Sequence, residues 1–91
     1  MSKYKRAAVG GTFDILHVGH KHLLGNSFQI SEEVVIGVTS DNFVNKLNKK
    51  VLNNYDARTN NIRDFIDSTF PNTKYDVYKL EDYFGPASFL E

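Results

Sequence analysis

The sequence predicts an α/β fold with a Rossmann-like parallel sheet in one small domain. Strand and helix patterns alternate along the 91 residues, and this alternation favours right-handed crossovers between parallel strands. Residues 34–39 form an unbroken apolar run rich in β-branched side chains, which is typical of a strand covered on both faces of a sheet. The length leaves room for a single domain with a modest core.

Six elements are expected, in the order strand, helix, strand, helix, helix, strand. They cover residues 6–9, 19–30, 34–39, 41–47, 56–70 and 75–80. The pair Gly10-Gly11 closes the first strand, and Ser40-Asp41 offers caps for the short fourth element. The apolar stripe of the long helix consists of Ile62, Phe65, Ile66 and Phe70. A turn at Gly85-Pro86 and a further helix starting in residues 87–91 complete the expected pattern.

Composition excludes several classes of protein. The 11 basic and 11 acidic side chains cancel, which argues against a nucleic-acid partner because duplex binders normally carry a basic excess. The chain has no cysteine, so disulfides and cysteine-based zinc sites are excluded. No apolar run is long enough to span a membrane, and the first six residues lack the apolar stretch of a signal peptide. These features predict a cytoplasmic, globular protein.

The segment after the first strand carries the unusual residues of the sequence. Gly10-Gly11 allows a tight backbone turn and the close approach of a ligand, and Thr12 adds a hydroxyl group. His17 and His20 lie at the start of the next helix, whose free N–H groups and dipole attract anions. Backbone donors and imidazoles without an acidic cluster predict a phosphate ligand.

Simpler interpretations of the same residues remain open. The glycine pair can be an ordinary turn. His17 and His20 can bind a metal, although such a site needs a carboxylate or a third inward-facing imidazole. A histidine at this position can also cap the helix or pack in the core. His22, two residues past His20, should face elsewhere and is expected to be an exposed structural residue.

Two longer patterns resemble a known family. Gly11-Thr12-Phe13-Asp14, followed by His17-Val18-Gly19-His20, resembles the GTFD…HxGH signature of the nucleotidyltransferase superfamily of cytidylyl- and adenylyltransferases. Residues 37–46, 55–58 and 80–87 are similar to the archaeal and eukaryotic type of pantetheine-phosphate adenylyltransferase. The resemblance covers nearly the whole chain. It implies a single nucleotidyltransferase domain of the HUP type over residues 1–91, with strand order 3-2-1.

The resemblance also implies an activity. Members of this family transfer AMP from ATP to 4′-phosphopantetheine in coenzyme A biosynthesis, and the products are 3′-dephospho-coenzyme A and pyrophosphate. Mg²⁺ is expected to bind together with ATP. The family uses no protein nucleophile, because the acceptor phosphate attacks the α-phosphorus directly. Such a reaction depends on aligning two polyanions and on stabilising the charge of the reacting phosphoryl group.

The matched motif positions imply roles for individual residues. His20 would contact the α-phosphate in the transition state, and His17 would bind ATP phosphates beside it. Thr12 would contact both the acceptor phosphate and the nucleotide. Gly11 and Phe13 are the other ATP-binding positions, with the Phe13 ring packed beside the ligand.

Further substrate-binding candidates lie later in the chain. Lys46 would pair with the phosphate of phosphopantetheine, and Lys49 and Lys50 are rivals for this role. Arg58 lies near a helix start, where a cation opposes the dipole. A ligand or a carboxylate should compensate its charge, and Arg58 is therefore another substrate-binding candidate. Asp14 is explained at least as well by capping of the turn through its side chain.

The chain departs from the family in one respect. It lacks an ISSTxI-like motif and a strand that would pair beside the first strand, so it resembles the amino-terminal part of a larger enzyme, incomplete at its C-terminal end. Glycerol-3-phosphate cytidylyltransferase and FAD synthetase share the signature and are alternatives, as is a non-catalytic nucleotide-binding fragment. The unpaired first strand predicts self-association through its edge.

Overall fold

The computed structural model describes residues 3–81 of the chain. Its elements occur in the predicted order: β1 (Tyr4–Gly11), α1 (Val18–Ile30), β2 (Ser31–Thr39), α2 (Asp41–Lys46), α3 (Tyr55–Thr69) and β3 (Lys74–Leu80). The turn expected at residues 85–86 and the helix expected at residues 87–91 lie outside the described residues. Within residues 3–81, every helix is too short or too polar to cross a bilayer.

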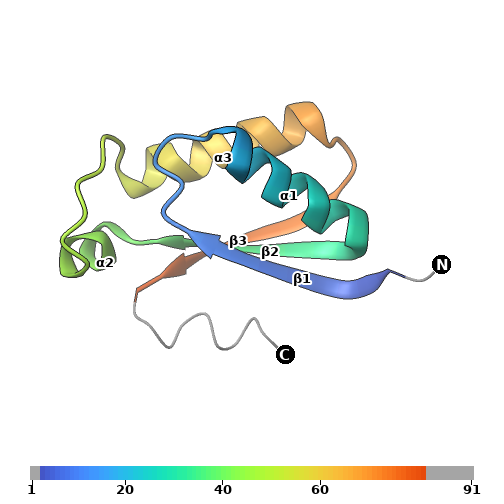
Figure 1. Ribbon diagram of the computed structural model, residues 1–91, viewed down its shortest axis with the longest axis horizontal. Helices are drawn as coiled ribbons and strands as arrows, with labels where there is room; N and C mark the ends of the chain where they lie inside the picture. Colours follow the sequence, from blue (N-terminus) through green and yellow to red (C-terminus); the bar gives the residue numbers. More distant parts are fainter. Residues whose placement is uncertain (1–2, 82–91) are drawn as a thin grey trace.

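The three strands form one parallel sheet in the order β1-β2-β3, which confirms the predicted strand order. Val9 of β1 and Val77 of β3 both pair with Ile36, so β2 is the central strand. Figure 1 shows α1 and α3 on the same face of this sheet. This is the arrangement expected when successive crossovers of one hand move in one direction across a sheet. Within the described residues, β1 and β3 are the two edges.

The core lies between the sheet and the two long helices. The fully buried apolar side chains come from all three: Leu24 of α1, Val34, Ile36 and Val38 of β2, and Ile62 and Ile66 of α3. On the other face of the sheet, a Cβ atom at Gly37 would lie 2.9 Å from the Leu80 side chain. Glycine at this position therefore lets Leu80 pack over the central strand. The predicted burial of β2 is confirmed along residues 34–39.

The strands begin earlier than the apolar pattern predicts. β1 begins at Tyr4 and β2 at Ser31, and these two residues pair with each other. The first residues of both strands are polar, and the Arg6 side chain forms an ion pair with Glu33 at 2.8 Å. Pairing between polar residues at the start of the sheet extends both strands, and a search for apolar runs misses such residues.

Side-chain caps set the beginnings of the later helices. The Ser40 hydroxyl accepts a 3.0 Å hydrogen bond from the Phe43 N–H, which confirms the cap predicted for α2. The Asn54 side chain accepts a 2.9 Å bond from the Ala57 N–H, so α3 begins one residue before its predicted start. Both caps satisfy a backbone donor that has no partner within its own helix.

Candidate functional site

The turn between β1 and α1 differs from the glycine turn that the sequence predicts. Gly10 and Gly11 are the last residues of β1, and neither has a positive φ angle. The left-handed residue is Phe13, with a φ of 54°, a conformation that is uncommon for residues other than glycine. A Cβ atom at Gly11 would lie 3.2 Å from the Phe13 ring. Gly11 therefore makes room for the Phe13 side chain.

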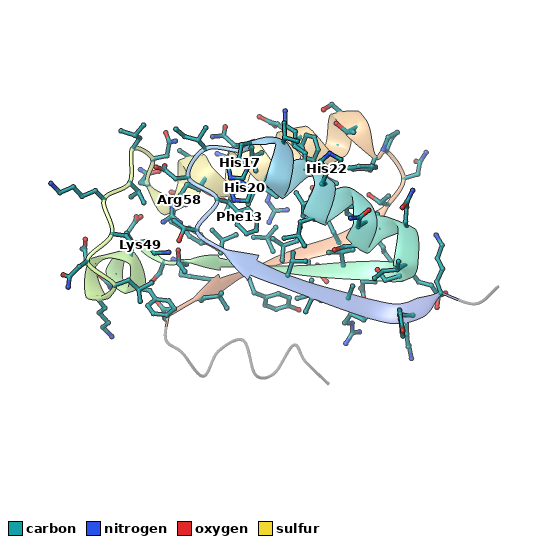
Figure 2. The ribbon with its side chains drawn as sticks, in the orientation of Figure 1. Phe13, His17, His20, His22, Lys49 and Arg58 are labelled. Carbon is teal, nitrogen blue, oxygen red and sulfur yellow. The ribbon has the colours of Figure 1, made fainter. Side chains whose placement is uncertain are left out.

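Phe13 supports the histidines from within the core. Its side chain is only 2% exposed, and its ring centroid lies 5.1 Å from that of His20. Figure 2 shows Phe13 below His17 and His20, on the side nearer the sheet. The buried ring lies under His20, and its expected packing beside the ligand stays a prediction.

His17 is the N-cap of α1, so the simpler interpretation that a histidine here caps the helix holds for this residue. Its Nδ1 accepts a 3.0 Å hydrogen bond from the Gly19 N–H, and the neutral ring therefore carries its proton on Nε2. A Cβ atom at residue 19 would lie 2.9 Å from His17 Cε1, which explains the glycine between the two histidines. The exposed ring keeps an N–H donor that the cap does not use.

His20 stacks on His17, with ring centroids 3.9 Å apart and an interplanar angle of 23°. Its Nδ1 is buried and has no hydrogen-bond partner among the described residues. Burial lowers the pKa of His20 and the neighbouring His17 lowers it further, while the backbone of Ile15 opposes part of the shift. His20 is therefore mostly neutral at pH 7. An anion beside the ring would raise its pKa and favour the imidazolium form.

The histidine pair is not arranged as a metal site. Lone pairs of imidazole nitrogens lie in the plane of the ring, and two nearly parallel stacked rings do not direct them at one ion. Within residues 3–81, no group of three His, Cys, Asp or Glu side chains could hold a metal ion. His22 is exposed, as expected for a structural surface residue.

Arg58 is fully buried and connects the segments that border the site. Its guanidinium donates hydrogen bonds to the carbonyl oxygens of Thr12 (2.9 Å), Thr39 (2.8 Å) and Asn53 (3.1 Å). Asp41, 2.9 Å from Nη2, is the carboxylate expected to compensate the arginine. The Arg58 side chain is 0% exposed and its guanidinium has protein partners, so it has a structural role here, and its predicted substrate contact stays a prediction. Arg58 fastens the loop after β1 to the end of β2.

Asp14 caps a turn, but the turn is distant in sequence. Its carboxylate accepts hydrogen bonds from the backbone N–H groups of Leu52 (2.8 Å) and Asn53 (2.9 Å), and the Asn53 amide donates to the Asp14 carbonyl at 2.9 Å. These bonds lower the pKa of Asp14, and the Leu52 N–H is the largest cause. Asp14 therefore attaches the segment before α3 to the loop after β1.

The candidate lysines lie at the same end of the sheet as this loop. Lys46 is the last residue of α2, Lys49 and Lys50 follow it, and all three are exposed. α2 follows the carboxyl end of β2, where the Thr12 and Thr39 hydroxyl oxygens lie 3.1 Å apart. Figure 2 labels Lys49 in the segment after α2. The assignment of Lys46 rather than a neighbouring lysine stays a prediction.

Sequence reasoning assigned no role to two residues that the structure places at this site, Thr39 and Asn53. Thr39 could have been found from strand register: Gly11 pairs with Val38, so Thr12, the first residue after β1, lies beside Thr39, the last residue of β2. Asn53 carries no such signal, because its contacts with Asp14 join segments that only the tertiary fold brings together.

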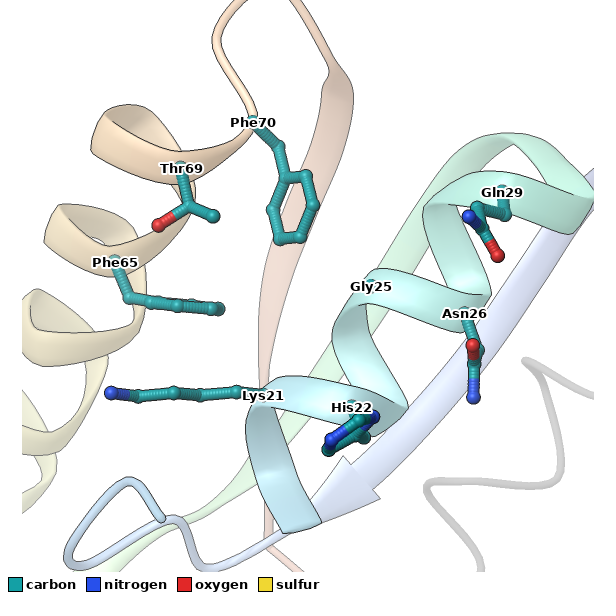
Figure 3. Close-up of a pocket in the computed structure, with 8 residues that line it drawn as sticks. All are labelled: Lys21, His22, Gly25, Asn26, Gln29, Phe65, Thr69 and Phe70. Carbon is teal, nitrogen blue, oxygen red and sulfur yellow. The ribbon is translucent and has the colours of Figure 1, made fainter. Parts of the chain in front are cut away.

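A separate groove of about 400 Å³ lies between α1 and α3 (Figure 3). Its lining consists of Lys21, His22, Gly25, Asn26, Gln29, Phe65, Thr69 and Phe70. The residues that the sequence predicts for the site all lie in the described part of the chain, and they do not line this groove. The candidate site is therefore the polar edge formed by the loop after β1, the start of α1 and the end of β2.

The fold defines a parallel α/β protein, in which ligands bind beyond the carboxyl ends of the strands, where this edge lies. In this class, the first strand of a parallel sheet leads through a short loop into a helix whose free N–H groups face an anion. Here that helix start carries two imidazoles. Residues 8–86 match the family described as cytidylyltransferase-like, and the chain belongs to this family.

Known proteins are similar to most of this chain. Phosphopantetheine adenylyltransferases of Methanopyrus kandleri and Methanosarcina barkeri are 35% and 39% identical to it, over 93% and 90% of its length. The same matches cover 54% and 52% of those relatives, so the chain spans about half their length. A crystal structure of a protein of unknown function from Archaeoglobus fulgidus superposes with a TM-score of 0.80 at 25% identity, covering 96% of this chain and 63% of that one. These findings confirm the predicted family and fold class.

Proposed function

We propose that this chain provides the phosphate-binding turn and the reactive histidines of a cytoplasmic adenylyltransferase in coenzyme A biosynthesis. The enzyme transfers AMP from ATP to 4′-phosphopantetheine and forms 3′-dephospho-coenzyme A and pyrophosphate. The observation that carries the proposal is the stacked pair of His17 and His20 at the start of α1. Relatives that are 32–39% identical to the chain are named phosphopantetheine adenylyltransferase. The activity is proposed for the whole protein, since the chain spans about half their length.

His20 acts on the reacting phosphoryl group. The acceptor phosphate attacks the α-phosphorus, the bond from that atom to the bridging oxygen breaks, and pyrophosphate leaves. Because Nδ1 is buried, Nε2 is the nitrogen that meets an α-phosphate oxygen. The approach of negative charge raises the pKa of His20, so the ring becomes a stronger donor as charge develops in the transition state.

The start of α1 and the preceding loop bind the remaining phosphate charge. His17 uses its Nε2–H on the ATP phosphates, because its Nδ1 is occupied by the Gly19 N–H. Gly11 ends β1 without a side chain, and the Thr12 hydroxyl lies at the mouth of the turn. These neutral donors and the helix dipole attract anions.

Lys46 is assigned to the phosphate of phosphopantetheine. It is an exposed cation at the end of α2, on the edge of the sheet where the Thr12 hydroxyl also lies. A flexible ammonium group suits an acceptor phosphate that must enter and then leave as part of the product. Lys49 and Lys50 are exposed near the same place and are the alternatives.

Mg²⁺ enters with ATP as part of the substrate. The acidic side chains nearest the site are already engaged: Asp14 accepts from the 52–53 backbone, and Asp41 pairs with Arg58. The described residues offer no group of three acidic or imidazole ligands. An ion carried by the phosphates of ATP offsets their charge and orients them, and needs no protein cage.

A substrate panel tests the proposal on the full-length gene product. Pyrophosphate release is measured with ATP or CTP, each with phosphopantetheine, glycerol 3-phosphate or FMN as the acceptor. We expect rapid release only with ATP and phosphopantetheine. Turnover of CTP with glycerol 3-phosphate, or of ATP with FMN, would instead identify a cytidylyltransferase or an FAD synthetase. Calorimetric binding of ATP without release in any pair would identify a non-catalytic nucleotide-binding protein.

A further inference from the structure

We infer that Thr39 is a positioning residue: it fixes the direction of a hydrogen-bond chain so that the Thr12 hydroxyl donates its proton to a bound phosphate. The chain runs from Arg58 through Thr39 to Thr12. This inference deepens the proposed function, on which it rests, because it explains how one phosphate contact is prepared before the substrate arrives.

The geometry of the chain joins three elements. Arg58 Nη1 lies 3.3 Å from Thr39 Oγ1 and 2.8 Å from the Thr39 carbonyl oxygen. Thr39 Oγ1 lies 3.1 Å from Thr12 Oγ1. Arg58 Nη1 also donates to the Thr12 carbonyl oxygen at 2.9 Å. The guanidinium therefore holds both the backbone of Thr12 and, through Thr39, its side chain.

The donor-only guanidinium and the burial of the Thr39 hydroxyl together set the direction of the whole chain. A guanidinium can only donate, so the Thr39 oxygen must accept from it. A hydroxyl oxygen can accept twice, but if Thr12 donated to Thr39, the single buried proton of Thr39 would lose its acceptor among the described residues, the Thr12 oxygen 3.1 Å away. Thr12 consequently accepts from Thr39 and keeps its own proton for another partner. Hydrogen bonds that run in one direction also polarise one another, which strengthens the last donor.

Burial keeps water from competing for the hydrogen bonds that set this direction. Arg58 is 0% exposed and Thr39 is 6% exposed, whereas Thr12 is half-buried and reaches the loop surface. If the direction were reversed, Thr12 would donate inward and present only lone pairs to a ligand. Lone pairs would repel a phosphate oxygen. The direction thus decides whether Thr12 attracts or repels an anion.

Three variants separate this role from simple packing. Thr39→Val keeps the shape but removes the hydroxyl, and Thr39→Ser keeps the hydroxyl and removes a methyl group. Thr59→Val is the matched control, because Thr59 is also buried but donates to the Asp56 carbonyl within α3. Calorimetry with ATP and rates of pyrophosphate release are measured on the full-length gene product. Urea unfolding of each variant shows whether it is folded.

We expect Thr39→Val to weaken ATP binding or lower kcat/KM by about 5- to 10-fold, the range of one lost hydrogen bond. Thr39→Ser should stay within about twofold of the wild type, and Thr59→Val should keep its wild-type kcat/KM. A Thr39→Val enzyme with unchanged ATP affinity and kcat/KM would overturn the inference. Equal losses in the Ser and Val variants would overturn it as well, because they would point to packing.

A second measurement does not depend on activity. Three-bond NMR couplings of Thr12 report whether its χ1 angle is fixed. The inference requires a fixed χ1 in the wild type and in Thr39→Ser, and an averaged χ1 in Thr39→Val. A fixed χ1 in Thr39→Val would overturn it. If the wild type neither binds ATP nor releases pyrophosphate, the proposed function fails, and the couplings alone then decide whether Thr39 positions Thr12.

Discussion

The imidazole rings of His17 and His20 stack at a centroid distance of 3.9 Å, with Phe13 beneath them. The two stacked rings differ in the hydrogen bonding of their Nδ1 atoms. His17 Nδ1 accepts a hydrogen bond from the Gly19 N–H at the start of α1. His20 Nδ1 is buried without a partner among the described residues, and the pKa of His20 is lowered. One ring is therefore suited to holding phosphates and the other to responding when charge develops.

Replacing His20 with alanine should reduce kcat much more than it weakens ATP binding. The imidazole is proposed to act on charge that develops in the transition state, and loss of such a donor typically costs on the order of 10²–10³ in rate. Steady-state kinetics and calorimetry on the full-length gene product measure both quantities. His22→Ala, two positions along α1 on an exposed residue, is the control. Near-normal kcat in His20→Ala would show that the reacting group lies elsewhere.

The stability of the fold should depend on the protonation of His20. Because the pKa of His20 is lowered by burial first and by His17 second, the unfolded chain binds this proton more readily than the folded chain. The contribution of His20 to the free energy of unfolding should reach its full size above about pH 6.5, the ordinary pKa of histidine. It should be lost as the pH drops through the lowered pKa of the folded state. Urea titrations at several pH values, compared with His20→Gln, measure this. Identical pH dependence in the two proteins would argue against a lowered pKa.

Gly19→Ala should destabilise the protein although alanine normally favours a helix. The added Cβ would lie 2.9 Å from His17 Cε1, so the ring must rotate and its hydrogen bond to residue 19 is lost. Loss of an N-cap costs about 1 kcal/mol, measured as the free energy of unfolding in urea. In a His17→Ala background the same substitution should become neutral or stabilising. A destabilisation that persists in that background would mean that the His17 ring is not the obstacle.

Lys46→Ala should raise the KM for phosphopantetheine and leave the ATP affinity close to normal. The exposed ammonium group is assigned to the acceptor phosphate alone. Kinetics at saturating ATP, with calorimetry for ATP itself, separate the two substrates. Lys49→Ala and Lys50→Ala are the matched comparisons. If either has the larger effect, the acceptor phosphate belongs to that lysine, and equal losses for both substrates would also count against Lys46.

A polypeptide of these 91 residues should bind ATP weakly, turn over little and self-associate through β1. Within the described residues, β1 pairs only with β2 and its middle is apolar at Ala7, Ala8 and Val9, whereas β3 carries the charged residues Lys74, Asp76 and Lys79. Exposed apolar edges favour pairing between chains, and an edge lysine opposes it.

Sedimentation velocity over a range of concentrations measures this association. Ala8→Lys should shift the protein toward monomer, and Gln29→Lys, which adds the same charge on exposed α1, should not. A wild-type polypeptide that stays monomeric throughout would refute association through this edge. Rapid adenylyl transfer by the monomer would refute the dependence of the site on residues outside the polypeptide.

Local signals predicted most of the fold. The Ser40 cap, the stripe of Ile62 and Ile66 and the apolar run of β2 each depend on residues a few positions apart, and each is confirmed. Alternation of strands and helices predicted a parallel sheet, and the resemblance to the family implied the strand order that the structure confirms. The position of the candidate site followed from the same topology, because loops at the carboxyl ends of parallel strands share one edge of the sheet.

The hydrogen bonds and backbone conformation inside the site could not be predicted in this way. Arginine is rarely buried, and the partners of Arg58 come from three separate segments that only the folded chain brings together. The positive φ angle of Phe13 was also missed. Sequence reasoning assigns such a turn to the neighbouring glycines, but here Gly11 serves to accommodate the Phe13 ring.

The direct junction between α1 and β2 restricts how related sequences can vary in length. α1 ends at Ile30 and β2 begins at Ser31, whose hydroxyl donates to the Ser27 carbonyl in the last turn of the helix. One extra residue there must either bulge out or turn every β2 side chain to the opposite face. Insertions and deletions should therefore accumulate in residues 71–73, which lie between α3 and β3 and contain no regular element, and a linker or tag engineered into the protein belongs there rather than at residue 30.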